Sequence, residues 1–183
     1  RIASGAVHCR HARAVFGSMV RVVTSLDEIL SSERIDVIVN LAGAPIIDRP
    51  WTPARRAELL DSRLSVTNKL TELIARLEHK PDVLINASAV GYYGVRGDEE
   101  ITEAARGQPI FQSHLCQAWE LAAQAAEQYD VRVCRLRFGI VLGMSGGMLP
   151  RLIPAARMRL LVVLGNRRQW QSWIHIGGLV HLL

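Results

Sequence analysis

The stretch Ile35–Leu41, with the sequence IDVIVNL, most constrains the fold, because it is nearly all apolar over the length of one β-strand. A strand at the surface of an antiparallel sheet alternates apolar and polar residues, whereas a parallel strand that is covered on both faces reads as a continuous apolar run. A long segment of helical spacing and then a second apolar run follow it. We therefore expect an α/β fold, in which parallel strands alternate with helices through right-handed crossovers.

Local signals in the sequence place further elements. Val20–Thr24 is a short β-branched run, and Ser25 with Glu28 three residues later has the spacing of a capping box. Thr52-Pro53 predicts the start of a long helix, with threonine as the cap and proline in the first turn. The other expected elements are strands at Val83–Ala87 and Val131–Phe138 and a helix from Phe111 to about Gln128.

The composition of the 183 residues is that of a globular protein, with 49% hydrophobic and 21% charged residues. No apolar run approaches the roughly 18 residues that a membrane span needs, and the first residues lack the apolar centre of a signal peptide. Three scattered cysteines form no disulfide framework, so we expect a cytoplasmic protein. The net charge of +5 is spread along the chain and not along one stripe, which argues against a nucleic-acid partner.

Small and polar residues follow two of the expected strands. Asn40-Leu41-Ala42-Gly43 ends the first, and Asn86-Ala87-Ser88-Ala89 ends the next. Ligands of open α/β sheets bind at the carboxyl ends of the strands, where small side chains let a flat ring or a ribose approach the backbone. The serine hydroxyl can hydrogen-bond a substrate oxygen. A plain glycine turn and a capping serine are the structural alternatives, and both stay open at this point.

Tyr92 and Tyr93 stand between Gly91 and Gly94, directly after the second strand. A phenol can transfer a proton if its environment suits the task, although aromatic packing on a loop explains the pair as well. The glycine spacing is superficially that of a phosphate-binding loop, but the acidic stretch 98–103 that follows would repel a pyrophosphate. His8, Cys9 and His11 lack a second cluster of ligands, so we expect no metal site.

Four motifs occur in a fixed order: NLAG after one strand, Ser88-Ala89 before YYG, RLRFGIVLG at Arg135–Gly143, and WIHI at Trp173–Ile176. This order resembles the extended short-chain dehydrogenase/reductase superfamily. It is most similar to the atypical branch of sugar-nucleotide epimerase-like, or NAD-dependent epimerase/dehydratase, proteins. The resemblance runs from about Phe16 to the C-terminus.

The resemblance implies a Rossmann-like parallel sheet flanked by helices, with NAD or NADP bound across the carboxyl ends of the strands. It implies these cofactor-binding residues: Asn40, Leu41, Ala42, Gly43, Arg63, Ser88, Arg137 and Gly139. Ser88 also matches the catalytic serine of the superfamily. Tyr92 and Tyr93 are the candidate acids beside it.

Two superfamily features are missing from the sequence. One is the glycine-rich first turn, which holds the pyrophosphate. The other is Tyr-x-x-x-Lys, because none of the three tyrosines has a lysine four residues later, and Gln112 and Cys116 take the two places. We therefore expect residues 1–183 to form a single incomplete NAD(P)-binding domain that lacks the first βαβ unit, with the C-terminal substrate domain absent.

The leading hypothesis is an NAD(P)-dependent epimerase/dehydratase-like oxidoreductase that acts on a small molecule such as a nucleotide sugar and is inactive as this fragment. The alternative is a non-catalytic dinucleotide-sensing or interaction module, which the missing Tyr-x-x-x-Lys favours. NLAG, Ser88 and RLRFGIVLG favour the enzyme. Without the first βαβ unit, Val20–Thr24 would lack its native neighbours, so we also expect an exposed sheet edge that is prone to self-association.

Overall fold

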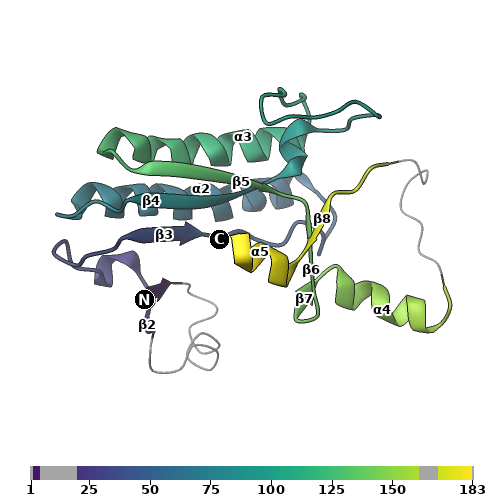
Figure 1. Ribbon diagram of the computed structural model, residues 1–183, viewed down its shortest axis with the longest axis horizontal. Coiled ribbons are helices and arrows are strands. Elements are labelled where there is room, and N and C mark those ends of the chain that lie inside the picture. The colour runs from purple at the N-terminus through teal and green to yellow at the C-terminus, as the bar shows by residue number, and fades with distance from the viewer. Residues whose placement is uncertain (1, 5–19, 161–168, 183) are drawn as a thin grey trace. The chain divides into compact units, whose positions relative to one another are not determined.

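A computed structural model describes residues 2–4, 20–160 and 169–182 of the chain (Figure 1). The chain divides into two compact units. Unit 1 comprises residues 1–86 and 118–135, and unit 2 comprises residues 87–117 and 136–183.

Unit 1 is built on parallel strands joined by helices. Strand β3 (Val37–Asn40) pairs in parallel with β4 (Val83–Ala89), with Val37 opposite Val83 and Asn40 opposite Asn86. The order in this sheet is β3-β4-β5, where β5 is Arg132–Phe138. Helix α2 (Pro53–Arg76) connects β3 to β4, and α3 (Phe111–Gln124) and the 3-10 helix η4 (Ala125–Tyr129) precede β5. The α/β alternation expected from the sequence is confirmed.

Local capping chemistry sets where the helices of unit 1 begin. The Thr52 hydroxyl accepts the Arg55 backbone N–H at 3.2 Å, and Pro53 occupies the first turn of α2. Ser25 caps the 3-10 helix η2 (Leu26–Glu28), and both hydrogen bonds of the capping box are present. Each such cap satisfies backbone N–H groups that have no partner within the helix. Both helix starts predicted from the sequence are therefore confirmed.

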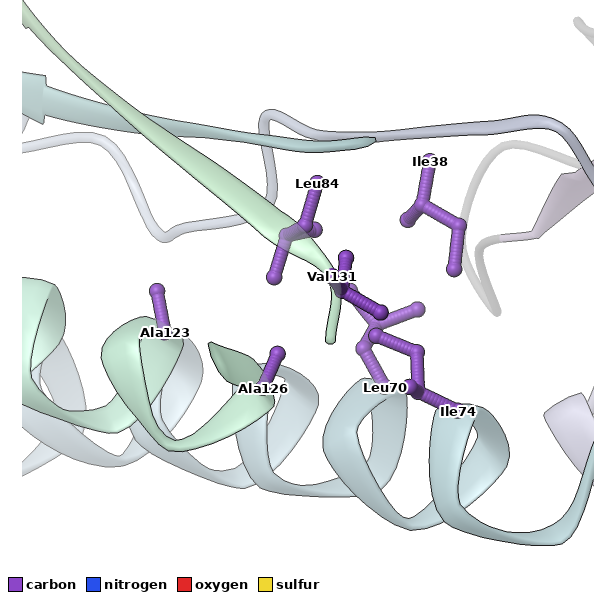
Figure 2. Close-up of a cluster of buried hydrophobic side chains, with 7 residues drawn as sticks. All are labelled: Ile38, Leu70, Ile74, Leu84, Ala123, Ala126 and Val131. Carbon is purple, nitrogen blue, oxygen red and sulfur yellow. The ribbon is translucent and has the colours of Figure 1, made fainter. Parts of the chain in front are cut away.

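The main hydrophobic core of unit 1 lies between the sheet and its helices (Figure 2). The strands contribute Ile38 and Leu84, and α2 contributes Leu70 and Ile74 from one face. Ala123 and Ala126 are small, which lets the second helical segment approach closely. The cluster comprises Ile38, Leu70, Ile74, Leu84, Ala123, Ala126 and Val131. Burying one side chain the size of leucine contributes about 1.5–3 kcal/mol to folding.

The described residues cover strand β3 on one face, whereas the sequence predicted that both faces are covered. Ile38 and Asn40 are buried, whereas Val37 and Val39 are 50% and 48% exposed. The described helices of unit 1 pack against the Ile38 face, as Figure 2 shows. A continuous apolar run indicates that a strand can be covered twice, but it does not show that both covering layers are present.

Strand β2 (Arg21–Val23) confirms the β-branched strand expected near the start of the chain. It pairs in parallel with β1 (Ile2–Ser4), with Ile2 opposite Arg21. The strand that was expected to lack its native neighbours thus has one parallel neighbour, β1, among the described residues. Val23 is 1% exposed and packs in a second core cluster, whose members are Val23, Ile29, Leu73 and Leu77. Self-association through a sheet edge stays a prediction.

Unit 2 contains a third, small sheet that the sequence did not predict. Strand β6 (Ile140–Gly143) pairs in parallel with β8 (Trp173–His175) and antiparallel with β7 (Gly146–Gly147). Helices α4 (Leu149–Arg157) and α5 (Ile176–Leu182) follow β7 and β8 in the chain. The RLRFGIVLG motif thus divides at Gly139 between two strands, where the sequence predicted one. No helix among the described residues is long and apolar enough to span a bilayer.

Replacement of Leu84 by alanine should lower the free energy of unfolding of unit 1 by about 2–5 kcal/mol, because a fully buried side chain leaves a cavity in the main core. Urea denaturation measures the change. Leu121→Ala is the matched control, since Leu121 is 70% exposed on α3 and its truncation leaves no cavity. Equal effects at the two positions would contradict the assignment of Leu84 to the core.

Candidate functional site

The Asn40–Gly43 turn begins where β3 ends, and the side chain of Asn40 points into unit 1. Asn40 is 3% exposed. Its Nδ2 donates hydrogen bonds to Thr67 Oγ1 at 2.9 Å and to Asn86 Oδ1 at 2.7 Å, and its Oδ1 accepts the Ala42 backbone N–H at 3.2 Å. The two asparagines that end neighbouring strands are therefore brought together, and the Asn40 amide holds the turn from within.

The guanidinium of Arg63 lies directly against this turn. Arg63 is 6% exposed on α2, and its Nη2 donates to the Ala44 carbonyl at 3.2 Å. A Cβ atom built on Gly43 would lie 2.8 Å from Arg63 Cζ, which is closer than real side chains approach. The guanidinium also stacks over the Trp119 ring at 5.0 Å. Gly43 is thus required by the cation behind it, which the sequence alone did not show.

The outer side of the turn is formed by small or exposed residues. Leu41 is 60% exposed, and Ala42 and Gly43 present little or no side chain. No residue from 40 to 44 is acidic, and Arg63 supplies a positive charge close behind. A surface of this kind suits a flat or anionic ligand that makes contact with the backbone.

A network of ion pairs fastens the loop that follows the turn to the start of α2. Arg55 is 4% exposed, and its guanidinium lies 2.6 Å from an Asp48 oxygen and 2.7 Å from a Glu58 oxygen. Arg55 also donates to the Pro45 carbonyl, and Arg49 pairs with Glu58 at 3.0 Å. The close approach of the Arg55 guanidinium is the largest cause that lowers the pKa of Glu58. The pKa of Asp48 is lowered too, because although burial raises it, the charge of Arg55 and the remaining contacts outweigh burial.

In unit 2, the structure brings Tyr92, Tyr93 and Arg137 together. Tyr92 and Tyr93 belong to the 3-10 helix η3 (Val90–Tyr93), and their rings meet edge to face with centroids 5.4 Å apart. The Arg137 guanidinium carbon lies 3.5 Å from the Tyr92 ring centroid, and its Nη1 donates to Tyr93 Oη at 2.9 Å. Arg137 Nη1 also donates to the Glu103 carbonyl at 3.0 Å. Because the Tyr93 oxygen accepts this bond, its phenolic hydrogen is directed elsewhere.

The backbone of the tyrosines is held by residues that the sequence analysis did not select. The Ser113 hydroxyl donates to the Tyr92 carbonyl and accepts hydrogen bonds from Gln108 N at 3.1 Å and Gln117 Nε2 at 2.9 Å. The Gln108 side chain pairs with both the N–H and the C=O of Val95, at 2.9 and 2.8 Å. Ser113 is fully buried near the start of α3. The sequence offers no signal for this role, because a lone serine in a helix has no distinctive pattern.

The remaining predicted residues of unit 2 are buried or closely packed. Ser88 is 4% exposed in the last part of β4. Gly139 lies against the backbone of Ser172, because a Cβ atom built there would be 2.5 Å from the Ser172 carbonyl oxygen. Gln112 and Cys116, at the places of the missing tyrosine and lysine, both approach Gly91, with 3.5 Å to Gln112 Cβ and 4.0 Å to Cys116 Sγ from a Cβ built on that glycine. Both side chains therefore lie close to Gly91.

Metal ligands do not gather in the part of the chain that the structure describes, where no group of three or more His, Cys, Asp or Glu side chains is suited to hold an ion. The sequence grouping His8, Cys9 and His11 lies outside the described residues. Of the predicted site residues, the structure thus groups Asn40–Gly43 with Arg63 in unit 1. It groups Tyr92 and Tyr93 with Arg137 in unit 2.

Replacement of Gly43 by alanine should destabilise the protein by about 1–3 kcal/mol, since the new methyl group displaces a tethered guanidinium. Thermal unfolding measures the change. The cost should fall in an Arg63→Met background, where the guanidinium is gone. Gly97→Ala is the control, because nothing lies within 4 Å of a Cβ built there. Strict additivity of the Gly43 and Arg63 changes would contradict the contact.

Replacement of Glu58 by glutamine should reduce the loss of stability on acidification. The folded-state pKa of Glu58 lies below its unfolded value, so its contribution is present above about pH 4.3 and is lost as the pH falls through the lowered pKa. Urea denaturation between about pH 6 and pH 3 checks this. Asp61→Asn is the control, because Asp61 makes none of the ion pairs found among the described residues. A Glu58→Gln profile parallel to that of the unmodified protein would show that Arg55 does not stabilise this carboxylate.

Comparison with protein families supplies the identity that the geometry leaves open. Residues 5–183 match the model of the NAD dependent epimerase/dehydratase family. The chain is 41% identical over 148 residues to a chloroplastic homologue of the epimerase family protein SDR39U1 from Arabidopsis thaliana, a match that covers 80% of this chain and 42% of that protein. It is also 41% identical over 147 residues to an epimerase family protein of Staphylococcus epidermidis, covering 80% of this chain and 49% of the relative. The chain therefore spans about half the length of the curated relatives it matches.

Solved structures agree with the fold. The human epimerase family protein SDR39U1 with NADPH matches with a TM-score of 0.77 and 28% identity, over 96% of this chain and 65% of the human one. A UDP-glucuronic acid 4-epimerase from Bacillus cereus, in complex with UDP-glucuronic acid and NAD, matches with a TM-score of 0.79 and 18% identity, over 98% of this chain and 62% of the other. The Rossmann-like α/β class is confirmed by these neighbours. The chain belongs to the NAD dependent epimerase/dehydratase family.

Proposed function

We propose that this chain forms part of an NAD(P)-dependent oxidoreductase of the epimerase/dehydratase type, whose substrate is a small molecule such as a nucleotide sugar. The observation that carries the proposal is the Asn40–Gly43 turn at the carboxyl end of β3, in a chain of this family. The human neighbour is described with NADPH, and the Bacillus cereus epimerase with NAD and UDP-glucuronic acid. Because the chain spans about half of its relatives, the activity is assigned to the full-length protein.

The residues of the turn fit a nicotinamide dinucleotide. Such a ligand carries flat rings, ribose hydroxyls and an anionic pyrophosphate, and the turn offers small side chains, backbone groups and a cation close behind. Leu41, Ala42 and Gly43 would border the adenine and ribose side, and Arg63 would contribute favourable charge from behind the turn. A bound dinucleotide would supply the acceptor and donor of hydride.

Ser88, Tyr93 and Arg137 are the residues proposed for the chemistry in unit 2. The Ser88 hydroxyl would hold the reacting oxygen of the substrate by a hydrogen bond. Tyr93 is favoured over Tyr92 as the proton-transferring phenol, because Arg137 fixes its oxygen from one side and leaves its hydrogen to be donated. Tyr92 instead presents its ring face to the same guanidinium. Arg137 is therefore a positioning residue in this proposal.

One observation favours a second candidate, a non-catalytic dinucleotide-sensing or interaction module. The positions of the superfamily's Tyr-x-x-x-Lys are held here by Gln112 and Cys116, and both pack toward Gly91. Loss of a positioned acid or base usually lowers a rate by about 10²–10⁴-fold. A protein that lacks this tyrosine and lysine can still bind a dinucleotide without catalysing a reaction.

Variants of the full-length protein distinguish the two candidates. NADH and NADPH fluorescence titrations should show saturable binding, and UDP-glucuronic acid and UDP-glucose are the first substrates to assay. Ser88→Ala and Tyr93→Phe should each lower kcat by about 10²–10⁴-fold with little change in dinucleotide affinity. Ser65→Ala and Tyr129→Phe are the matched controls, since both lie in unit 1. The isolated 183-residue chain is expected to transfer no hydride.

The outcomes separate cleanly. Turnover that depends on Ser88 and Tyr93 supports the enzyme. Dinucleotide binding without turnover favours the sensing module, if Ser88→Ala and Tyr93→Phe also leave the dinucleotide affinity unchanged. Absence of binding at millimolar NADH and NADPH would defeat the enzyme and a dinucleotide-sensing role, and would leave the interaction module.

A further inference from the structure

A buried hydrogen-bond network centred on Thr67 lies behind the Asn40–Gly43 turn. Thr67 is fully buried on α2, and Trp119 is 6% exposed on α3. The Trp119 indole Nε1 donates to Thr67 Oγ1 at 3.1 Å, and Asn40 Nδ2 donates to the same oxygen at 2.9 Å. The network therefore joins the two helices to the end of β3 within unit 1.

The hydroxyl of Thr67 uses its full hydrogen-bonding capacity. A hydroxyl has one donor and two acceptor sites. The donor goes to the Arg63 carbonyl at 2.8 Å, and the two acceptor sites receive Asn40 and Trp119. A second threonine one turn later, Thr71, makes the same kind of bond to the carbonyl four residues back, at 3.2 Å. Thr67 differs from Thr71 because its hydroxyl also accepts hydrogen bonds from two side chains, those of Asn40 and Trp119.

These bonds fix which way the Asn40 amide faces. Asn86 Oδ1 is an acceptor, and Thr67 Oγ1 has already spent its hydrogen, so both neighbours require the NH₂ group of Asn40. The amide oxygen is thereby directed to the Ala42 N–H at 3.2 Å. A flipped amide would set oxygen against oxygen at Asn86 and leave Ala42 without this acceptor.

We propose that Thr67 and Trp119 are positioning residues for the dinucleotide site, which act through Asn40 to hold the Ala42 N–H and the shape of the turn. Neither residue belongs to the turn itself. The choice of ligand rests on the proposed function, whereas the effect on the turn does not. Removing the Thr67 hydroxyl would leave the Trp119 indole and one Asn40 N–H without their acceptor, and only Asn86 would then hold the NH₂ group of the amide that accepts from Ala42.

The test uses the full-length protein and the variants Thr67→Val, Thr67→Ser and Thr71→Val. Backbone hydrogen exchange at Ala42 measures the turn without any ligand, and NADPH and NADH titration measures the site. In Thr67→Val, exchange at Ala42 should accelerate at least about tenfold and dinucleotide affinity should fall about tenfold. Thr67→Ser keeps the hydroxyl and Thr71→Val keeps the network, so both should stay close to the unmodified protein.

A measurement on the unmodified protein keeps the proposal testable if Thr67→Val does not fold. The indole proton of Trp119, assigned with Trp119→Phe, should exchange with solvent at least about tenfold more slowly than that of Trp170. Trp170 is 80% exposed and donates to Asp98, which makes it the matched reference. Exchange of the Trp119 proton as fast as that of Trp170 would overturn the network.

Three other results would overturn the proposal. The first is that Ala42 exchanges as slowly in Thr67→Val as in the unmodified protein. The second is that Thr67→Ser accelerates Ala42 exchange as much as Thr67→Val does. The third is that Thr67→Val accelerates Ala42 exchange but leaves the dinucleotide affinity unchanged. If the unmodified protein binds neither NADH nor NADPH, the proposed function fails and the assignment of the turn to a dinucleotide fails with it. Ala42 exchange then decides the structural role of the network by itself.

Discussion

The buried amide of Asn40 is the interaction on which the arrangement of unit 1 depends. An amide moved from water into a protein interior is destabilising by several kcal/mol unless its hydrogen bonds are replaced. Here both N–H donors of the amide are used, toward Thr67 and Asn86, and its oxygen accepts from the Ala42 backbone. The need to satisfy this one amide therefore fixes the register of β3 against β4, the rotation of α2 about its axis and the conformation of the first residues after β3. A leucine at this place would fill the space and specify none of these relations.

The guanidinium groups of both units act in a similar way on the loops. Arg63 donates to the Ala44 carbonyl, Arg76 to the Ile29 and Leu26 carbonyls, and Arg96 to the Tyr93 carbonyl. Loop carbonyls near the protein surface need partners as much as helix ends do.

Much of the fold could be predicted from the sequence, because local rules determine it. The Thr52-Pro53 start of α2 and the Ser25 capping box depend on residues three or four positions apart, and both were confirmed. The apolar run at β3 predicted a strand correctly and its covering wrongly, since Val37 and Val39 are half-exposed. A continuous apolar run shows that a strand can be covered on both faces, but whether a layer packs on each face depends on segments elsewhere in the chain.

The site could be predicted less well for the same reason. Asn40 and Gly43 were selected by their place at a strand end, but the contacts that explain them come from Arg63, Thr67 and Trp119, which lie 20 or more residues away in the chain. Ser113 escaped notice because a lone buried serine in a helix has no sequence signature. Long-range partners of this kind are visible only once the helices are placed.

The Arg137 contacts have a consequence for which replacements the chain can accept. One planar group presents its face to Tyr92 and its edge to the Tyr93 hydroxyl and the Glu103 carbonyl. A lysine would bring an equal charge to the same place, but an ammonium group has no face to stack and no fixed fork of donors. The planar shape of the side chain therefore restricts substitution at position 137 more than its charge does. A homologue with lysine at this position would need different contacts around both tyrosine side chains.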